Sequence, residues 1–222
     1  MASDSGSVYL WNGVDVNRHM EQKEGSIMKK FSKLQILGLI LIICSLVLLV
    51  GSRVYEARAK QTAAAVVEKM EALLPEKSEG SMESFTNMSM PLLQIDGLNF
   101  SGLLEVPSFG VTLPIYDAWE ASRTWSFPCR FSGSVYDGSL VVGGSDQAGQ
   151  FDFCSKLDLG AYIRVTDMTG AQYEYEVTRI VRSKHAEAEK LDGDEPGLTL
   201  FVRDRYSMQY IIVRCSAEGT SE

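Results

Sequence analysis

The stretch AYIRVTDMTGAQYEYEVTRI, residues 161–180, decides the fold class because it has the pattern of two β-strands joined by a tight turn. Within it, YEYEV at 173–177 alternates between large apolar and acidic side chains, as a half-buried strand does. DMTG at 167–170 lies between the two runs and supplies the glycine that such a turn favours. The stretch therefore predicts a pair of connected strands.

Short β-type runs continue on both sides of this pair from about residue 98, separated by Gly, Pro, Asp and Ser. One segment differs, because QFDFCSKLDLG at 150–160 spaces Phe153 and Leu157 as a short helix does. Many short strands with one or two small helices predict a mainly β fold, a closed or nearly closed barrel. The further runs are FSGLLEVPSF (100–109), VTLPIYDAW (111–119), GSLVVGG (138–144), LTLFV (198–202) and YIIVR (210–214).

An uncharged apolar segment, LQILGLILIICSLVLLVGS at 34–52, precedes the barrel and is long enough to span a bilayer. The tripeptide ARA at 57–59 is a candidate cleavage site, but the apolar core is long for a removable signal peptide. We therefore predict that residues 34–52 form an uncleaved transmembrane signal anchor.

The flanking charges predict which end of the anchor faces the cytoplasm. Residues 1–33 are polar, and Met28 before two lysines is an alternative start of translation. Basic residues on the N-terminal side favour a cytoplasmic N-terminus, although Arg53, Arg58 and Lys60 weaken the asymmetry. The prediction is a single-pass protein of the cell membrane with an extracellular C-terminal domain. The N-terminal lysines are Lys23, Lys29, Lys30 and Lys33.

Residues 53–97 are predicted to form a helical stalk followed by a polar linker. The first part, to residue 74, is rich in Ala, Glu and Lys and contains neither Gly nor Pro, which favours a helix that ends before Pro75. The stalk would space the barrel from the bilayer, and a partner-binding coiled coil is the alternative, although the apolar repeat is short for one. The expected apolar stripe consists of Val66, Met70, Leu73 and Leu74.

The composition argues against several classes of function. A formal net charge of −8 is unsuited to binding nucleic acid, which needs a basic surface. The four cysteines form no CxxC pair and no Cys/His cluster at metal-ligand spacing. Neither a GxGxxG nor a GxxxxGK[ST] motif occurs, so we expect no cofactor and no metal.

The order of the runs resembles that of the sortase domain. GLLEVPSFGVTLPIYDAW (102–119) is similar to its opening strands, and the segment SLVVGGSDQAGQFDFCSKLDLGAYIRVTDMTGAQYEYEVTRI (139–180) is similar to its middle section. LTLFV and YIIVR, at 198–202 and 210–214, resemble its T-L-x-T-C and closing R-x-x-V-R strands. The resemblance implies a sortase-like closed β-barrel at residues 98–217, with a short tail at 218–222.

The resemblance also implies which positions would carry the family's chemistry. Sortases are cysteine transpeptidases of Gram-positive cell surfaces that cleave a sorting signal and pass its acyl group to an amine. They need a thiolate, an imidazole and an arginine. Here the matching positions hold Ser145, Arg203 and Tyr210, and a guanidinium that stays protonated has no nucleophilic capacity. A degenerate, catalytically inactive member of the family is the expectation.

Two residues offer an alternative, an active transpeptidase or hydrolase with unusual catalytic groups. Cys215 would serve only in a shifted register, but then an arginine strand should follow, and the last seven residues hold neither Arg nor Lys. His185 lies in a charged run, and no spacing argument pairs it with Ser145 or Cys129. Cys215 is expected to be a structural thiol, although Cys129, Cys154 and Cys215 leave one disulfide possible.

The functional hypothesis is a binding or accessory factor in cell-surface protein or pilus anchoring. Its ligand would be a cell-surface protein, a pilin, a sorting-signal peptide or an active sortase. A purely structural barrel is a third possibility. If a groove is kept, its binding residues would be Ser145, Arg203, Arg205 and Tyr210.

Overall fold

A computed structural model describes residues 33–80, 89–185 and 196–217. Our predictions for residues 1–32, including a start at Met28, and for the tail at 218–222 fall outside these ranges. The chain divides into two compact units, Met1–Val50 and Gly51–Glu222. Each unit is described by itself.

The first unit contains the apolar part of helix α1 (Lys33–Leu73). The large hydrophobic side chains between Ile36 and Val50 are all exposed, and the helix is long and apolar enough to cross a membrane. The segment predicted as a membrane anchor is therefore helical, and its surface has the composition that a lipid environment requires.

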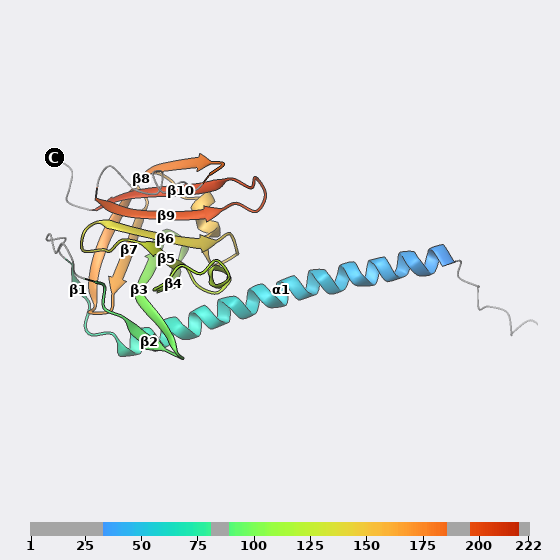
Figure 1. Cartoon of the computed structure of the whole chain (residues 1–222), viewed down its shortest axis with the longest axis horizontal. Helices are drawn as coiled ribbons and strands as arrows, with labels where there is room; N and C mark the ends of the chain where they lie inside the picture. Colours follow the sequence, from blue (N-terminus) through green and yellow to red (C-terminus); the bar gives the residue numbers. More distant parts are fainter. Residues whose placement is uncertain (1–32, 81–88, 186–195, 218–222) are drawn as a thin grey trace, which may run out of the picture. The chain divides into compact units, whose positions relative to one another are not determined.

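The second unit is built around a closed β-barrel, which confirms the predicted fold class (Figure 1). Eight strands form the ring in the order β8-β10-β9-β6-β5-β4-β3-β7, and β7 pairs again with β8. Two short strands lie outside the ring, since β1 adds to β8 and β2 adds to β3. The strands are β1 (Ser78–Glu79), β2 (Leu93–Ile95), β3 (Leu98–Val106), β4 (Val111–Tyr116), β5 (Cys129–Ser132), β6 (Ser139–Ser145), β7 (Tyr162–Asp167), β8 (Ala171–Ser183), β9 (Gly197–Arg203) and β10 (Tyr210–Ala217).

The predicted pair of strands is the hairpin of β7 and β8, and its turn is fixed by Asp167. The buried carboxylate accepts hydrogen bonds from the backbone N–H groups of Thr169 (2.8 Å) and Ala171 (3.0 Å). Its other oxygen accepts a hydrogen bond from the hydroxyl of Tyr136 at 2.8 Å. Gly170 has a φ of 86°, a backbone conformation that residues with a side chain rarely adopt, so the glycine of DMTG is required.

Among the described residues, three short 3₁₀ turns accompany the barrel strands: η2 (Pro107–Phe109), η3 (Arg123–Trp125) and η4 (Phe151–Ser155). The last of them occupies the segment in which we predicted a short helix. Phe151, Phe153 and Cys154 of η4 are buried in the barrel core. The helical spacing was therefore a sign of one buried turn.

Strand alternation separates the inner and outer faces of the barrel. In β6, β9 and β10 one set of side chains lies in the main core, and the set between them is on the other face of the sheet, where Val141, Phe201 and Ile212 form a separate buried cluster. Because the outer set holds the positions that the sequence singled out, this alternation determines how they are presented. The inner set is Leu140, Val142, Leu198, Leu200, Val202, Ile211, Val213 and Cys215.

The second half of α1 packs against the barrel instead of standing free as a spacer. Met70 is fully buried and Val66 nearly so, in a cluster with Phe100, Leu103 and Phe127. Within the predicted stripe Val66 and Met70 are buried, whereas Leu73 at the helix end is 63% exposed. The helical part of the predicted stalk is therefore packed into the folded unit.

Candidate functional site

Strand register brings three predicted positions into one row on the outer face of the barrel. Ser145 is the partner of Arg203 across the parallel pair of β6 and β9. Arg203 is in turn the partner of Tyr210 across the antiparallel pair of β9 and β10. Neighbouring strands lie about 5 Å apart, so the Ser145–Arg203–Tyr210 row is about 10 Å long.

Arg203 occupies the middle of the row and its side chain is exposed. The guanidinium carbon lies 5.9 Å from the centre of the Tyr210 ring, within the range of a cation–π contact. Within the described part of the chain no carboxylate lies within ion-pair distance of Arg203. The ring therefore holds a cation whose charge is not neutralised by a neighbouring acid.

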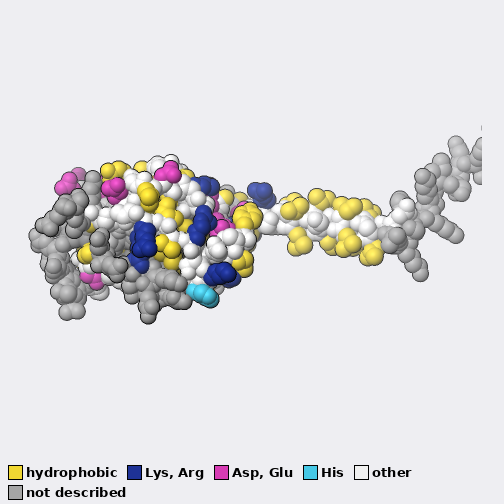
Figure 2. Space-filling view, turned by 90° about the horizontal axis from the view of Figure 1, so that it is seen from above, with side chains coloured by type: hydrophobic (Ala, Val, Ile, Leu, Met, Phe, Trp, Pro, Cys, Tyr) yellow, Lys and Arg dark blue, Asp and Glu magenta, His cyan; other side chains and the backbone are white. Residues whose placement is uncertain are grey.

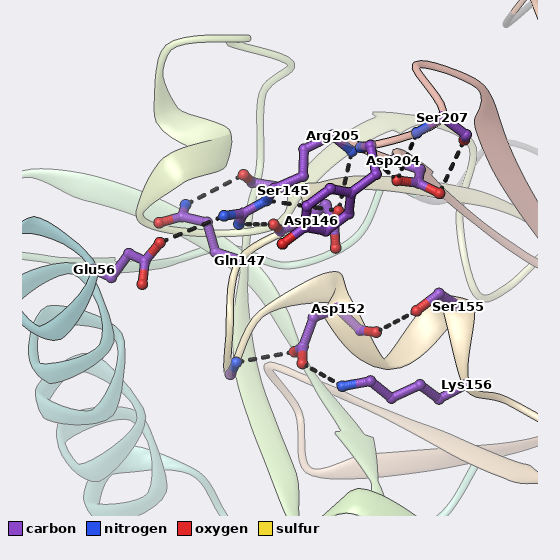
Figure 3. A network of polar contacts seen from close by, with 12 residues as sticks. Glu56, Ser145, Asp146, Gln147, Asp152, Ser155, Lys156, Asp204, Arg205 and Ser207 are labelled. Atoms are coloured by element: carbon purple, nitrogen blue, oxygen red, sulfur yellow. Dashed lines mark hydrogen bonds and ion pairs between the residues drawn. The ribbon is translucent and has the colours of Figure 1, made fainter. Parts of the chain in front are cut away.

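Ser145 is held by the buried side chain of Gln147. The amide nitrogen of Gln147 donates to the Ser145 hydroxyl at 3.2 Å and to the carbonyl oxygen of Trp125 at 2.9 Å (Figure 3). Because the serine oxygen accepts this bond, its own proton is directed elsewhere. The Ser145 O–H is thus not used in this bond.

An aromatic cluster lies on the same face of the sheet, next to the row and two residues earlier along β9. Phe201, two residues before Arg203, has its ring centre 5.3 Å from that of Trp119 and 5.5 Å from that of Phe131. Gly143 leaves room for them, since a Cβ there would lie 2.4 Å from Trp119 and 2.5 Å from Phe201. Trp119 and Phe131 are each about 40% exposed and Phe201 beneath them is buried, so the accessible part of the Trp119–Phe131–Phe201 cluster is the Trp119 and Phe131 rings.

Arg205, the fourth predicted residue, is engaged elsewhere. Its guanidinium lies 3.5 Å from Oε1 of Glu56 on α1 and 3.7 Å from Oδ2 of Asp146, and it donates to the backbone carbonyl of Asp146 (Figure 3). The backbone N–H of Arg205 also donates to Asp146 Oδ2 at 3.1 Å. Arg205 thus ties two loops and a helix together and lies outside the row.

The turn that follows Arg203 is organised by Asp204. Its carboxylate accepts hydrogen bonds from the backbone N–H of Tyr206 (2.8 Å) and from the hydroxyl of Ser207 (2.9 Å). These bonds, with Arg182 at 3.6 Å, hold the pKa of Asp204 below its usual range. The carboxylate beside Arg203 in the chain is therefore directed into its own turn.

Cys215 lies on the inner face of β10 and is 4% exposed. Burial raises its pKa well above that of an ordinary thiol, which disfavours the thiolate that nucleophilic attack requires. Cys154 is also in the core, and burial raises its pKa as well. Cys129 donates its S–H to the carbonyls of Phe127 and Glu120. All three are free thiols, so the disulfide that the sequence left open is not formed.

His185 is exposed beyond the end of β8. Its backbone N–H donates to Ser183, which is the register partner of Tyr210. Ser183 on β8 and Ser145 on β6 are therefore three strand spacings apart, across β10 and β9, which is roughly 14 Å. A hydrogen-bonded pair of His185 and Ser145 is incompatible with this register, and Cys129 is buried on β5.

The row therefore consists of hydrogen-bond donors. Arg203 supplies a permanent cation, Ser145 an oriented hydroxyl and Tyr210 a phenol. None of the three is an activated nucleophile or a base near neutral pH, whereas a guanidinium with hydroxyl donors suits a carboxylate. The described ranges hold no group of three or more His, Cys, Asp or Glu residues placed to bind a metal ion. Figure 2 shows Lys and Arg side chains among hydrophobic ones on the face over β8, β10 and β9.

Sequence reasoning missed the aromatic cluster and the role of Glu56. Trp119 ends a strand-like run and Phe131 lies in SFPCRFSGS, residues 126–134, but neither pattern indicates that the two rings meet on Phe201. The signal for Glu56 was absent, since one acidic residue in a helix of mixed charge does not indicate its partner.

No protein-family model matches the chain, and no curated protein does. Solved structures with a similar fold include the sortase D5 transpeptidase of Clostridium perfringens, which is 19% identical with a TM-score of 0.48, covering 54% of this chain and 79% of that one. Sortase C1 of Streptococcus agalactiae is 18% identical with a TM-score of 0.48, over 58% and 72% of the two chains. Clostridium perfringens sortase C, solved with the C-terminal cell wall sorting motif, is 20% identical with a TM-score of 0.46, over 53% and 70%.

Proposed function

We propose that this chain is a membrane-anchored, sortase-like protein without transpeptidase activity, which binds a peptide segment of a cell-surface protein on the outer face of its barrel. It acts as a binding or accessory factor in the anchoring of surface proteins or pili. The barrel is extracellular, and residues 34–52 hold it at the cell membrane. Its candidate ligands are a sorting-signal peptide, a pilin or an active sortase.

The observation that carries the proposal is the Ser145–Arg203–Tyr210 row. The resemblance to sortases assigns the family's histidine, cysteine and arginine to these positions, and the register places the three residues side by side. The residues present there bind by donating hydrogen bonds, and they provide neither a thiolate nor an imidazole. The arrangement supports binding in place of catalysis.

An active enzyme that uses Cys215 or His185 is the alternative, and two observations oppose it. Cys215 is enclosed in the barrel core on the opposite face of β10 from Tyr210. His185 lies beyond the end of β8, three strands from β6. A mechanism that combined them would require the sheet to open.

Turnover and binding can be measured on the full chain in detergent micelles. We expect a fluorescent sorting-signal peptide to bind while its mass stays unchanged in the presence of a small amine nucleophile. Cleavage or amine transfer that disappears in Cys215→Ala but persists in Cys154→Ala would overturn the proposal in favour of the enzyme. Absence of binding by any surface-protein or pilin peptide would favour a purely structural barrel.

A further inference from the structure

We infer that the outer face of β6, β9 and β10 recognises a free C-terminal carboxylate, with Arg203 as its anchor and the Trp119–Phe131–Phe201 cluster as the support for the preceding side chains. This inference rests on the proposed function and specifies its ligand as a peptide that ends in an α-carboxylate after apolar residues.

The first argument is the charge of Arg203 compared with its neighbours. Arg205 is paired with Asp146 and Glu56, and Arg182 is paired with Asp204. Arg203 has a cation–π contact with the Tyr210 ring and no ion-pair partner among the described residues. In a chain with a net charge of −8, a cation held in place without an acidic partner is suited to a charge supplied by a ligand.

The second argument is the donor pattern around that cation. Gln147 occupies a lone pair of the Ser145 oxygen, so the Ser145 proton is not used in that bond, and Tyr210, the register partner of Arg203 on β10, carries a second hydroxyl. A carboxylate has two oxygens that accept from such a set, whereas a peptide carbonyl has one. A phosphate group is usually bound by several cations or by a helix N-terminus, and the row provides one cation.

The third argument is where the sheet ends. Strands β6 and β9 end at Ser145 and Arg203, and β10 begins at Tyr210, so the row is the last row of this part of the sheet. The aromatic cluster lies next to the row along the strands, and because Val141 and Ile212 are buried, the exposed apolar surface there comes from Trp119 and Phe131. An extended peptide that lies on the exposed parts of Trp119 and Phe131 would therefore reach Arg203 where the sheet stops, which suits a chain terminus.

The test compares two peptides of identical sequence with apolar final residues, one ending in a free carboxylate and one in an amide. Binding of each to the full chain in micelles is measured by fluorescence anisotropy. We expect the acid to bind about tenfold more tightly or better, and Arg203→Gln to reduce its affinity to that of the amide. The matched control, Arg179→Gln, removes another exposed arginine of the outer face on β8 and should leave the preference unchanged.

The outcomes separate the inference from the function on which it rests. Equal binding of acid and amide would overturn the carboxylate site while leaving peptide binding intact. Failure of both peptides to bind would contradict the proposed function as well. Trp119→Ala should weaken both peptides to a similar degree, and a selective loss of the acid in that variant would contradict the division of roles between the cluster and Arg203. Circular dichroism of each variant verifies that the barrel is folded.

Discussion

Arg205 Nη1 lies 3.5 Å from Oε1 of Glu56, so the turn between β9 and β10 is tied to helix α1. Arg205 also pairs with Asp146, whereas within the described part of the chain Glu56 pairs with Arg205 alone. Glu56→Gln should therefore lower the free energy of unfolding by less than about 1 kcal/mol, as expected for a partly exposed pair. Arg205→Gln should cost more, because it leaves two carboxylates without their cation. Urea unfolding of both variants tests the order, and a larger loss in Glu56→Gln would contradict it.

The docked part of α1 gives a sharper stability prediction. Met70 has no exposed surface, so Met70→Ala should destabilise the second unit by about 2–5 kcal/mol through lost burial and a residual cavity. Leu73→Ala is the matched control on the same helix, since that side chain is 63% exposed and its loss should change stability by about 0.5 kcal/mol or less. Similar losses in the two variants would show that the helix does not pack as described.

Gly143 is predicted to be intolerant of a side chain. A Cβ there would lie 2.4 Å from Trp119 and 2.5 Å from Phe201, so Gly143→Ala should displace the indole and cost about 1–3 kcal/mol. The displacement should appear as a red shift of tryptophan emission as the indole gains contact with water. Gly51→Ala is the control, since nothing lies within 4 Å of a Cβ at that helical position. Unchanged emission in Gly143→Ala would contradict the packing of the cluster.

The buried thiols should be chemically inert in the folded protein. Cys129, Cys154 and Cys215 are free and buried, so a thiol reagent should modify them only after denaturation. The measurement is made in a Cys44→Ser background, which removes the one exposed cysteine. If one thiol is modified rapidly under native conditions and this fast reaction is lost in Cys215→Ala, the result would support Cys215 as a nucleophile.

Stability should fall at alkaline pH. Burial raises the pKa of Cys215 and Cys154 above the ordinary thiol value of 9.0, and raises that of Tyr173 to about 12 from 10.0. The unfolded chain therefore releases these protons at lower pH than the folded chain. The stabilisation is present in full below pH 9 and is lost as the pH rises above it. Urea midpoints between pH 7 and 11 test this, and a flat profile would contradict it.

The sequence was sufficient for the barrel, and for a physical reason. Alternation and turn residues are local signals, so they predicted the hairpin of β7 and β8 and most other strands. Ser145, Arg203 and Tyr210 were singled out only through the resemblance to sortases, and the register pairs them across β6, β9 and β10.

Contacts between distant segments were beyond prediction from local patterns. Arg205 was assigned to the binding face, but its partners Asp146 and Glu56 lie in a loop and a helix far away in the sequence. The apolar stripe on α1 indicated that Val66 and Met70 pack against other residues. Nothing in the stripe identified Phe100 and Phe127 as the residues they pack against. Leu73 matched the apolar periodicity, but it is the last residue of α1 and its side chain is mostly exposed to solvent.

The docking of α1 determines where the folded domain must be cut for study in solution. A chain truncated at Pro75 would expose Phe100, Leu103 and Phe127 to water, and a contiguous apolar surface of this kind promotes aggregation. The second compact unit begins at Gly51, so the shortest soluble fragment has to retain helical residues that composition alone would discard as a tether. Those residues carry part of the hydrophobic core, and they determine whether the barrel can be handled without detergent.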